Sequence, residues 1–161
     1  MNCIAIIPAG GKGLRSGSAT PKQYLKVNGR EIIVYTLQTF QKNKLIDRII
    51  IAAEPEYFSA LIKLIKKYKL SKVKLIVEGG STRQQSVYNA VLSSGADAND
   101  LLVVHDAARA LIPNDILTNA IISARENGNA LVCIKAKDTL IKGKKFVDEY
   151  LNRDEVYYVQ T

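Results

Sequence analysis

Five short apolar runs alternate with helical segments along this chain, and that alternation limits its fold more than any other feature. The apolar runs are residues 3–7, 48–53, 73–77, 101–104 and 130–134. The segments between them repeat apolar residues every three or four positions, as amphipathic helices do. These helical segments are residues 32–40, 56–68, 82–92 and 114–126. Near-continuous apolar strands separated by helices predict an α/β fold with a doubly wound, mostly parallel, Rossmann-like sheet.

The pattern changes after Ile134. Short apolar runs on either side of Gly143-Lys144 predict a β-hairpin rather than another strand–helix unit, and we expect a protruding β-arm over residues 136–155. A length of 161 residues is enough for one domain with a sizeable core. We therefore expect residues 1–161 to form a single domain. Because the chain stops directly after an apolar, strand-like stretch, we expect this domain to be incomplete at its C-terminal end.

Composition narrows the class of protein. No stretch of eighteen apolar residues is present, so no membrane span is expected. The N-terminus runs straight into a strand pattern without the basic region of a signal peptide, which favours a cytoplasmic location. Cys3 and Cys133 both lie in apolar runs, so we expect two small buried hydrophobic residues rather than a disulfide or a metal site.

The chain is basic, with 23 Lys and Arg residues against 15 Asp and Glu residues and a net charge of +8. That excess favours anionic partners such as nucleotides, sugar phosphates or nucleic acid. Many of the lysines lie between residues 63 and 74, on or just after one predicted helix, where a solvated face is the simplest interpretation. Few aromatic residues are available to stack on bases, so nucleic-acid binding by a non-catalytic domain remains only an alternative.

A glycine-rich turn follows the first apolar run, with the sequence Ala9-Gly10-Gly11-Lys12-Gly13-Leu14-Arg15. Glycines let backbone N–H groups approach a phosphate without a Cβ in the way, and Arg15 and Lys22 add positive charge. The turn therefore predicts a nucleoside triphosphate site, although a plain strand-to-helix turn would look similar. Neither a Walker A loop nor a complete G-x-G-x-x-G fingerprint is present, since Ser16 replaces the third glycine.

Further polar clusters follow the later strands, at residues 79–86, 105–109 and 135–139. In open parallel sheets, ligands bind outside the carboxyl ends of the strands, so we expect these clusters to share one edge with the glycine turn. Several roles stay open. Ser81 could contact a base or ribose or cap a helix, and Arg83 could contact a nucleotide or a neighbouring segment. Asp106 could hold Mg²⁺ or pair with Arg109, while His105 is expected to orient or pack rather than act as a base.

The motifs PAGGKGLR, PKQYL, GGSTRQQSV, VHDAAR, KDT and NRDEVYYVQT together resemble the 2-C-methyl-D-erythritol 4-phosphate cytidylyltransferase family of isoprenoid biosynthesis. The ribitol-5-phosphate cytidylyltransferases are the main rival. The resemblance implies a sheet of the nucleotide-diphospho-sugar transferase type. It also implies transfer from CTP to a polyol phosphate, giving 4-diphosphocytidyl-2-C-methyl-D-erythritol and pyrophosphate. Mg²⁺ is the implied cofactor, and a homodimer formed through the β-arm is the implied assembly, with no nucleic acid or membrane partner.

By position in these motifs, the resemblance also implies roles for individual residues. The implied catalytic residues are Arg15, Lys22 and Arg153. The implied CTP-binding residues are Ala9, Gly10, Gly11, Gly13, Gly80, Ser81, Arg83, Ser86 and Ala107. The implied residues for the acceptor are Asp106, Arg109, Thr139 and Thr161, with Asp106 also toward the metal. One departure concerns Gly10, which stands where the family usually has a second alanine and should loosen the turn.

Overall fold

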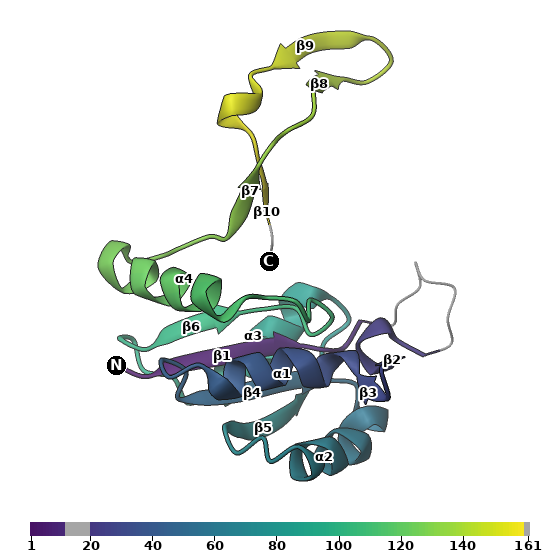
Figure 1. The fold of residues 1–161 in the computed structure, drawn as a ribbon, viewed down its shortest axis with the longest axis vertical. Coiled ribbons are helices and arrows are strands. Elements are labelled where there is room, and N and C mark those ends of the chain that lie inside the picture. The colour runs from purple at the N-terminus through teal and green to yellow at the C-terminus, as the bar shows by residue number, and fades with distance from the viewer. Residues whose placement is uncertain (12–19, 160–161) are drawn as a thin grey trace.

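A four-stranded parallel sheet forms the centre of the computed structural model, which describes residues 1–11 and 20–159 (Figure 1). Its strands are β1 (Cys3–Pro8), β4 (Arg48–Ala53), β5 (Val73–Glu78) and β6 (Leu101–Val104). Their order across the sheet is β5-β4-β1-β6, and every neighbouring pair is parallel. The chain therefore builds outward from β1 in one direction and then returns to add β6 on the other side. Such a reversal is where open α/β sheets bind ligands.

Four helices cover both faces of this sheet, as predicted for a doubly wound fold. They are α1 (Ile32–Lys42), α2 (Phe58–Lys67), α3 (Arg83–Ser93) and α4 (Asn114–Asn127). Because successive strand residues point to opposite faces, the odd-numbered residues of β1 pack with α1, α2 and α4. The even-numbered residues Ile4 and Ile6 pack on the other face, where Ala90 of α3 is buried.

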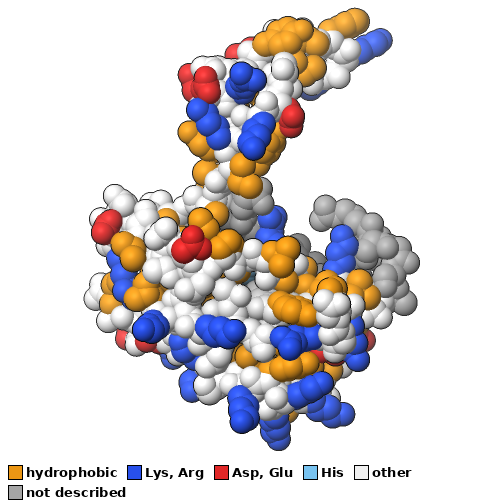
Figure 2. Space-filling view, in the orientation of Figure 1, with side chains coloured by type: hydrophobic (Ala, Val, Ile, Leu, Met, Phe, Trp, Pro, Cys, Tyr) orange, Lys and Arg blue, Asp and Glu red, His pale blue; other side chains and the backbone are white. Residues whose placement is uncertain are grey.

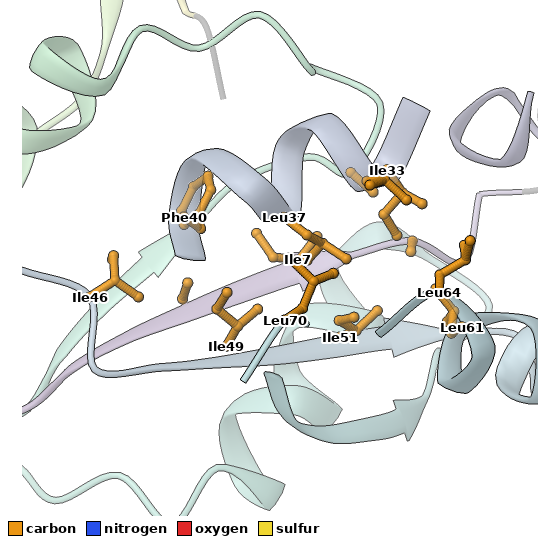
Figure 3. Close-up of a cluster of buried hydrophobic side chains, with 14 of the residues drawn as sticks. Ile7, Ile33, Leu37, Phe40, Ile46, Ile49, Ile51, Leu61, Leu64 and Leu70 are labelled. Atoms are coloured by element: carbon orange, nitrogen blue, oxygen red, sulfur yellow. The ribbon is translucent and has the colours of Figure 1, made fainter. Parts of the chain in front are cut away.

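The larger of the two hydrophobic clusters is built around α1 (Figure 3). Ile33, Leu37 and Phe40 lie one helical turn apart and are fully buried against Ile7 and Ile49 of the sheet. Burying each such side chain contributes about 1.5–3 kcal/mol. This cluster fixes α1, whose Thr36 Oγ1 donates to the carbonyl of Ala107 in the loop after β6.

The lysine-rich helix has the solvated face that its sequence predicts. Leu61 and Leu64 of α2 are buried, whereas Lys63, Lys66 and Lys67 are exposed. Figure 2 shows Lys and Arg side chains gathered over the lower part of the body, around the end where α2 lies in Figure 1. Within the described residues, no helix is both long enough and apolar enough to cross a membrane.

A small hairpin that the sequence analysis missed follows the 3₁₀ turn η2 (Lys22–Tyr24). Its strands are β2 (Lys26–Val27) and β3 (Arg30–Glu31), and they pair antiparallel. Asn28 and Gly29 between them both have positive φ, at 50° and 72°. An Asn-Gly pair is the strongest short signal for such a turn, so this hairpin was readable from the sequence.

The predicted β-hairpin arm is present and rises away from the sheet and its helices (Figure 1). Its tip is β8 (Leu140–Gly143) paired with β9 (Val147–Leu151), and its stem is β7 (Cys133–Lys135) paired with β10 (Tyr157–Val159). A 3₁₀ turn, η4 (Arg153–Glu155), joins β9 to β10.

Two expectations about this region are wrong. The run at residues 130–134 does not supply a fifth parallel strand, because β7 leaves the sheet and pairs only with β10 among the described strands. Cys133 lies in that stem and is exposed, whereas Cys3 is buried as expected. An apolar run is the same signal for a strand inside a sheet and for one in a two-stranded stem.

Candidate functional site

A cleft of about 800 Å³ opens at the carboxyl ends of the parallel strands. Its walls come from the segments that follow β1, β4, β5 and β6, together with η2. The predicted site residues that line it are Ala9, Gly10, Gly11, Lys22, Gly80, Ser81, Arg83, Ser86, Asp106 and Ala107. Three of the polar clusters therefore meet at one edge, as the strand-end rule predicts.

Other predicted residues lie elsewhere. Thr139 and Arg153 are exposed on the arm, so the cluster at residues 135–139 does not join this edge and that expectation is wrong. Arg109 stands at the rim, where it faces Asp106 and also lines a separate apolar groove along β6 and α4. The positions of Gly13, Arg15 and Thr161 lie outside the described residues.

The glycine turn after β1 is held by two kinds of hydrogen bond. The backbone N–H of Ala9 donates to the carbonyl of Ala52 at 2.6 Å. The side-chain amide of Gln23 donates to the carbonyl of Ala9 at 2.6 Å and to that of Gly11 at 3.2 Å. The sequence analysis quoted Gln23 within the PKQYL motif but assigned it no role.

The loop after β5 is organised by Ser86. Its buried Oγ accepts from the Gly80 N–H at 3.0 Å and donates to the Thr82 carbonyl at 2.9 Å. Thr82, rather than Ser81, caps α3, because its Oγ1 accepts from the Gln85 N–H at 3.1 Å. The capping interpretation of Ser81 is therefore wrong, and its exposed hydroxyl lines the cleft.

Asp106 is paired with two guanidinium groups. Arg83 Nε lies 2.8 Å from its Oδ1, and Arg109 Nε lies 3.3 Å from its Oδ2. The pairing with Arg109, which was one of the two alternatives for Asp106, is present, and Arg83 makes a local contact in addition to lining the cleft. Among the described residues, Lys22 and Arg83 are the cationic side chains that line the cleft, and they suit an anionic ligand.

Two buried side chains hold the loop that carries Asp106. His105 Nε2 donates to the carbonyl of Arg109 at 2.9 Å, and its ring centroid lies 5.2 Å from that of Phe40. Since a carbonyl only accepts, Nε2 carries a proton, and burial lowers the pKa of His105 below its ordinary value. Thr36 Oγ1 of α1 donates to the Ala107 carbonyl at 2.9 Å. The expected orienting role of His105 is thus confirmed.

Two carboxylates in the cleft escaped the sequence analysis. Glu54 directly follows β4 and Glu78 ends β5, and both line the cleft. Glu54 follows its strand just as Gly79-Gly80 follow theirs, so the strand-end rule applied to every strand would have found it. With Asp106, they give the described lining of the cleft three carboxylates beside the cations of Lys22 and Arg83.

The implied Mg²⁺ would need oxygen ligands from the side chains of the cleft. Among residues 1–11 and 20–159, no group of three or more His, Cys, Asp or Glu side chains gathers as a metal cluster. Mg²⁺ is commonly held by one or two carboxylates, with phosphate oxygens and water completing its octahedron. Asp106 could supply one such oxygen, so the residues fit an ion that a bound triphosphate carries in.

Comparison with known proteins gives consistent matches. A family model for 2-C-methyl-D-erythritol 4-phosphate cytidylyltransferase matches residues 3–161. The protein of that name from Clostridium acetobutylicum is 42% identical over 164 residues, covering 100% of this chain and 70% of the relative. A ribitol-5-phosphate cytidylyltransferase from Lacticaseibacillus paracasei is 32% identical, covering 98% of this chain and 69% of the relative.

Among solved structures, the 4-diphosphocytidyl-2C-methyl-D-erythritol synthase of Anaerococcus prevotii superposes with a TM-score of 0.82 at 29% identity. That superposition covers 99% of this chain and 67% of the solved chain. This chain therefore matches about 70% of the length of such relatives. The superposition on the solved structure thus extends over nearly the whole of this chain.

Proposed function

The chain belongs to the 2-C-methyl-D-erythritol 4-phosphate cytidylyltransferase family, and from that premise we propose that its strand-end cleft joins CTP to 2-C-methyl-D-erythritol 4-phosphate. A phosphate oxygen of the acceptor attacks the α-phosphorus of CTP. The bond from that phosphorus to the oxygen bridging to the β-phosphorus breaks, and pyrophosphate leaves. The single observation that carries the proposal is the convergence of the glycine turn, Lys22 and Arg83 on one cleft.

In this proposal the residues after β1 and those of η2 bind the phosphates of CTP. Gly11 has open space where a side chain would stand, so phosphate oxygens can approach its backbone, and the exposed Lys22 supplies a flexible ammonium group. In a displacement at phosphorus, positioning and charge stabilisation supply nearly all of the catalysis. Lys22 then stabilises the charge that develops on the α-phosphate, a role that the family resemblance also assigns to Arg15.

The loop after β5 binds the nucleoside end of CTP. Gly80, Ser81 and Ala107 line the same cleft, and Ser86 keeps Gly80 in place through its Oγ. Glycine at position 80 is required sterically, since a Cβ there would lie 3.0 Å from the Gln85 carbonyl carbon and closer still to its side chain. Ser86 thus acts on the loop rather than on the ligand directly.

The acceptor binds at the rim of the cleft, beside the loop that follows β6. Arg109 offers a guanidinium for the acceptor's phosphate, and Asp106 offers oxygens for its hydroxyl groups. When Mg²⁺ is bound, it supplies neutralisation of the triphosphate's charge, with Asp106 as its candidate protein ligand. Arg83 holds Asp106 from the other side and so links the acceptor's position to that of the nucleotide.

We also propose a homodimer formed through the arm. Its apolar side chains include Ile141, Phe146 and Tyr150, which are 53%, 77% and 73% exposed. Figure 2 shows hydrophobic side chains along this protrusion. A two-stranded hairpin is only marginally stable alone, and contiguous apolar surface marks an interface. Such a dimer would bring Thr139 and Arg153 to the partner's cleft.

Pyrophosphate release tests the function. With CTP, Mg²⁺ and 2-C-methyl-D-erythritol 4-phosphate, the wild-type chain should release pyrophosphate. Replacing Lys22 by Met should lower kcat about 10²–10³-fold, as expected when a charge-stabilising donor is lost. Lys26→Met is the matched control, because Lys26 is exposed nearby in β2 and pairs with Glu31 outside the cleft. Equal activity in the two variants would remove Lys22 from the proposal.

Exchanging the acceptor separates the two cytidylyltransferase activities. The match to a ribitol-5-phosphate enzyme keeps that acceptor as the second candidate. A higher kcat/KM with 2-C-methyl-D-erythritol 4-phosphate supports the main proposal, and a higher value with ribitol 5-phosphate replaces it.

A further inference from the structure

We propose that Gln23 is a positioning residue for nucleotide binding, which turns the peptide groups of the glycine turn so that a backbone N–H faces the triphosphate. This inference rests on the proposed function and adds to it a role for Gln23, which lines the cleft and holds the turn from there.

The Gln23 side chain is 6% exposed and spans two carbonyl groups of one turn. Its Nε2 lies 2.6 Å from the Ala9 oxygen and 3.2 Å from the Gly11 oxygen. A primary amide carries two N–H groups, so one nitrogen can donate to both carbonyls at once. Ala9 and Gly11 flank Gly10, so Gln23 determines how the chain turns on either side of it.

The direction of the Gly10 N–H follows from that bond. The described peptide bonds are trans, and in a trans peptide the C=O of one residue and the N–H of the next point in opposite directions. With its oxygen bound to Gln23, the Ala9 carbonyl sends the Gly10 N–H away from the Gln23 side chain. Gly10 lines the cleft, and backbone N–H groups in such turns form anion sites.

Gln23 is itself anchored. It lies in η2 between Lys22 and Tyr24, and the Tyr24 ring stacks on Tyr57 with centroids 4.0 Å apart and planes 8° apart. The backbone N–H of Tyr24 donates to the Pro21 carbonyl at 2.9 Å. A fixed η2 therefore sets both the Lys22 ammonium and the glycine turn, which explains why the lysine and the glutamine are adjacent.

Substitution of the amide tests the proposal. Gln23→Met keeps the length of the side chain and removes both donors, and Gln23→Glu places a carboxylate against two carbonyl oxygens. We expect the Kd for CTP, measured by calorimetry, to rise about tenfold in Gln23→Met and further in Gln23→Glu. KM for CTP should rise by a similar factor, while KM for the acceptor stays within about twofold of wild type.

Gln41→Met is the matched control. Gln41 also joins two segments through its amide, since its Nε2 donates to Ser71 Oγ at 3.0 Å and its Oε1 accepts from the Lys72 N–H at 2.8 Å. It lies in α1 and does not line the cleft. This variant should lower Tm and leave the Kd for CTP unchanged. If Gln23→Met behaves in the same way, Gln23 is structural only and the proposal is overturned.

A measurement on the wild-type chain keeps the test decisive if the Gln23 variants fail to fold. The amide resonance of Gly10 should move markedly when CTP is added, because a phosphate oxygen then accepts from it. An unmoved resonance in a protein that binds CTP overturns the positioning role alone. A wild-type chain that binds no CTP by calorimetry overturns the proposed function, and the inference with it.

Discussion

Arg83 at the start of α3 reaches the carboxylate that follows β6, and its Nε lies 2.8 Å from Asp106 Oδ1. Arg109 occupies the other carboxylate oxygen at 3.3 Å, so both oxygens of Asp106 face cations. Each carboxylate oxygen has two lone pairs, so Asp106 can still accept from a hydroxyl group or bind a metal ion while both guanidinium groups hold it in place.

Replacing Arg83 by Gln should lower kcat/KM about 10–100-fold, since hydrogen bonds to charged groups contribute about 1.5–3 kcal/mol. The loss should appear in KM for CTP and in kcat, measured by pyrophosphate release. Arg48→Gln is the control, because Arg48 pairs with Asp100 at 3.9 Å and does not line the cleft. A similar loss of activity in both variants would show that neither arginine acts through the cleft.

Two glycines of the cleft should respond oppositely to alanine. In Gly80→Ala the new Cβ meets Gln85, and overpacking of this kind costs about 1–3 kcal/mol. In Gly10→Ala the nearest atoms, Glu54 Oε1 and Ser86 Oγ, are 3.6 Å away and φ is not positive. That variant should gain about 0.4–1 kcal/mol through a less flexible unfolded chain. Urea denaturation of both variants gives the sign directly, and destabilisation by Gly10→Ala would contradict the geometry.

The folded chain should become less stable as the pH falls, because protonation of His105 is less favourable in the folded state. Burial lowers its pKa below the ordinary value of 6.5, which outweighs the opposing hydrogen bond to the Arg109 carbonyl. The unfolded chain therefore takes up the proton more readily than the folded one. The free energy that neutral His105 contributes to folding is fully present above about pH 6.5, and it is lost as the pH falls toward the pKa of His105 in the folded chain. Tm of the wild type should drop between about pH 7.5 and 5 more steeply than that of His105→Gln, which does not titrate there. Parallel curves would exclude this role.

Dimerisation through the arm should depend on one face of the hairpin. Ile141 and Tyr150 are cross-strand partners, and Lys142 and Glu149 are the next pair, which points to the other face. In sedimentation equilibrium, the double variant Ile141→Ser with Tyr150→Ser should be monomeric at concentrations where the wild type is dimeric. Lys142→Ser with Glu149→Ser should remain a dimer. A wild type that stays monomeric at every concentration would refute the dimer itself.

Strands and helices could be predicted wherever the hydrophobic pattern of a segment fits only one kind of structure. Residues 48–53 and 101–104 are strands exactly at their predicted bounds, because buried parallel strands are apolar along their whole length. Residues 130–134 carry the same pattern, yet the strand there pairs with β10 in the arm. The difference lies in the partner strand, which a short apolar run does not specify.

Some residues of the candidate site could also be predicted from the sequence, whereas others could not. The glycine turn and the polar clusters after β5 and β6 were found from the strand-end rule, which needs only strand direction. Glu54 was missed because the rule was not applied to its strand. Gln23 carries no local signal, since its partners Ala9 and Gly11 lie 14 and 12 residues away.

Sequence alone determined the periods of the strands and helices, the covered parallel sheet and the family to which the chain belongs. These features depend on spacings of a few residues or on motifs read in order, so they need no knowledge of contacts. Only the tertiary structure decided that Arg83 meets Asp106 and that Gln23 bonds to the carbonyls of Ala9 and Gly11. Those pairings arise when β6 is placed beside β1 and η2 packs against the turn. The order of strands across a sheet minimises the free energy of the whole chain and is not written in any one segment.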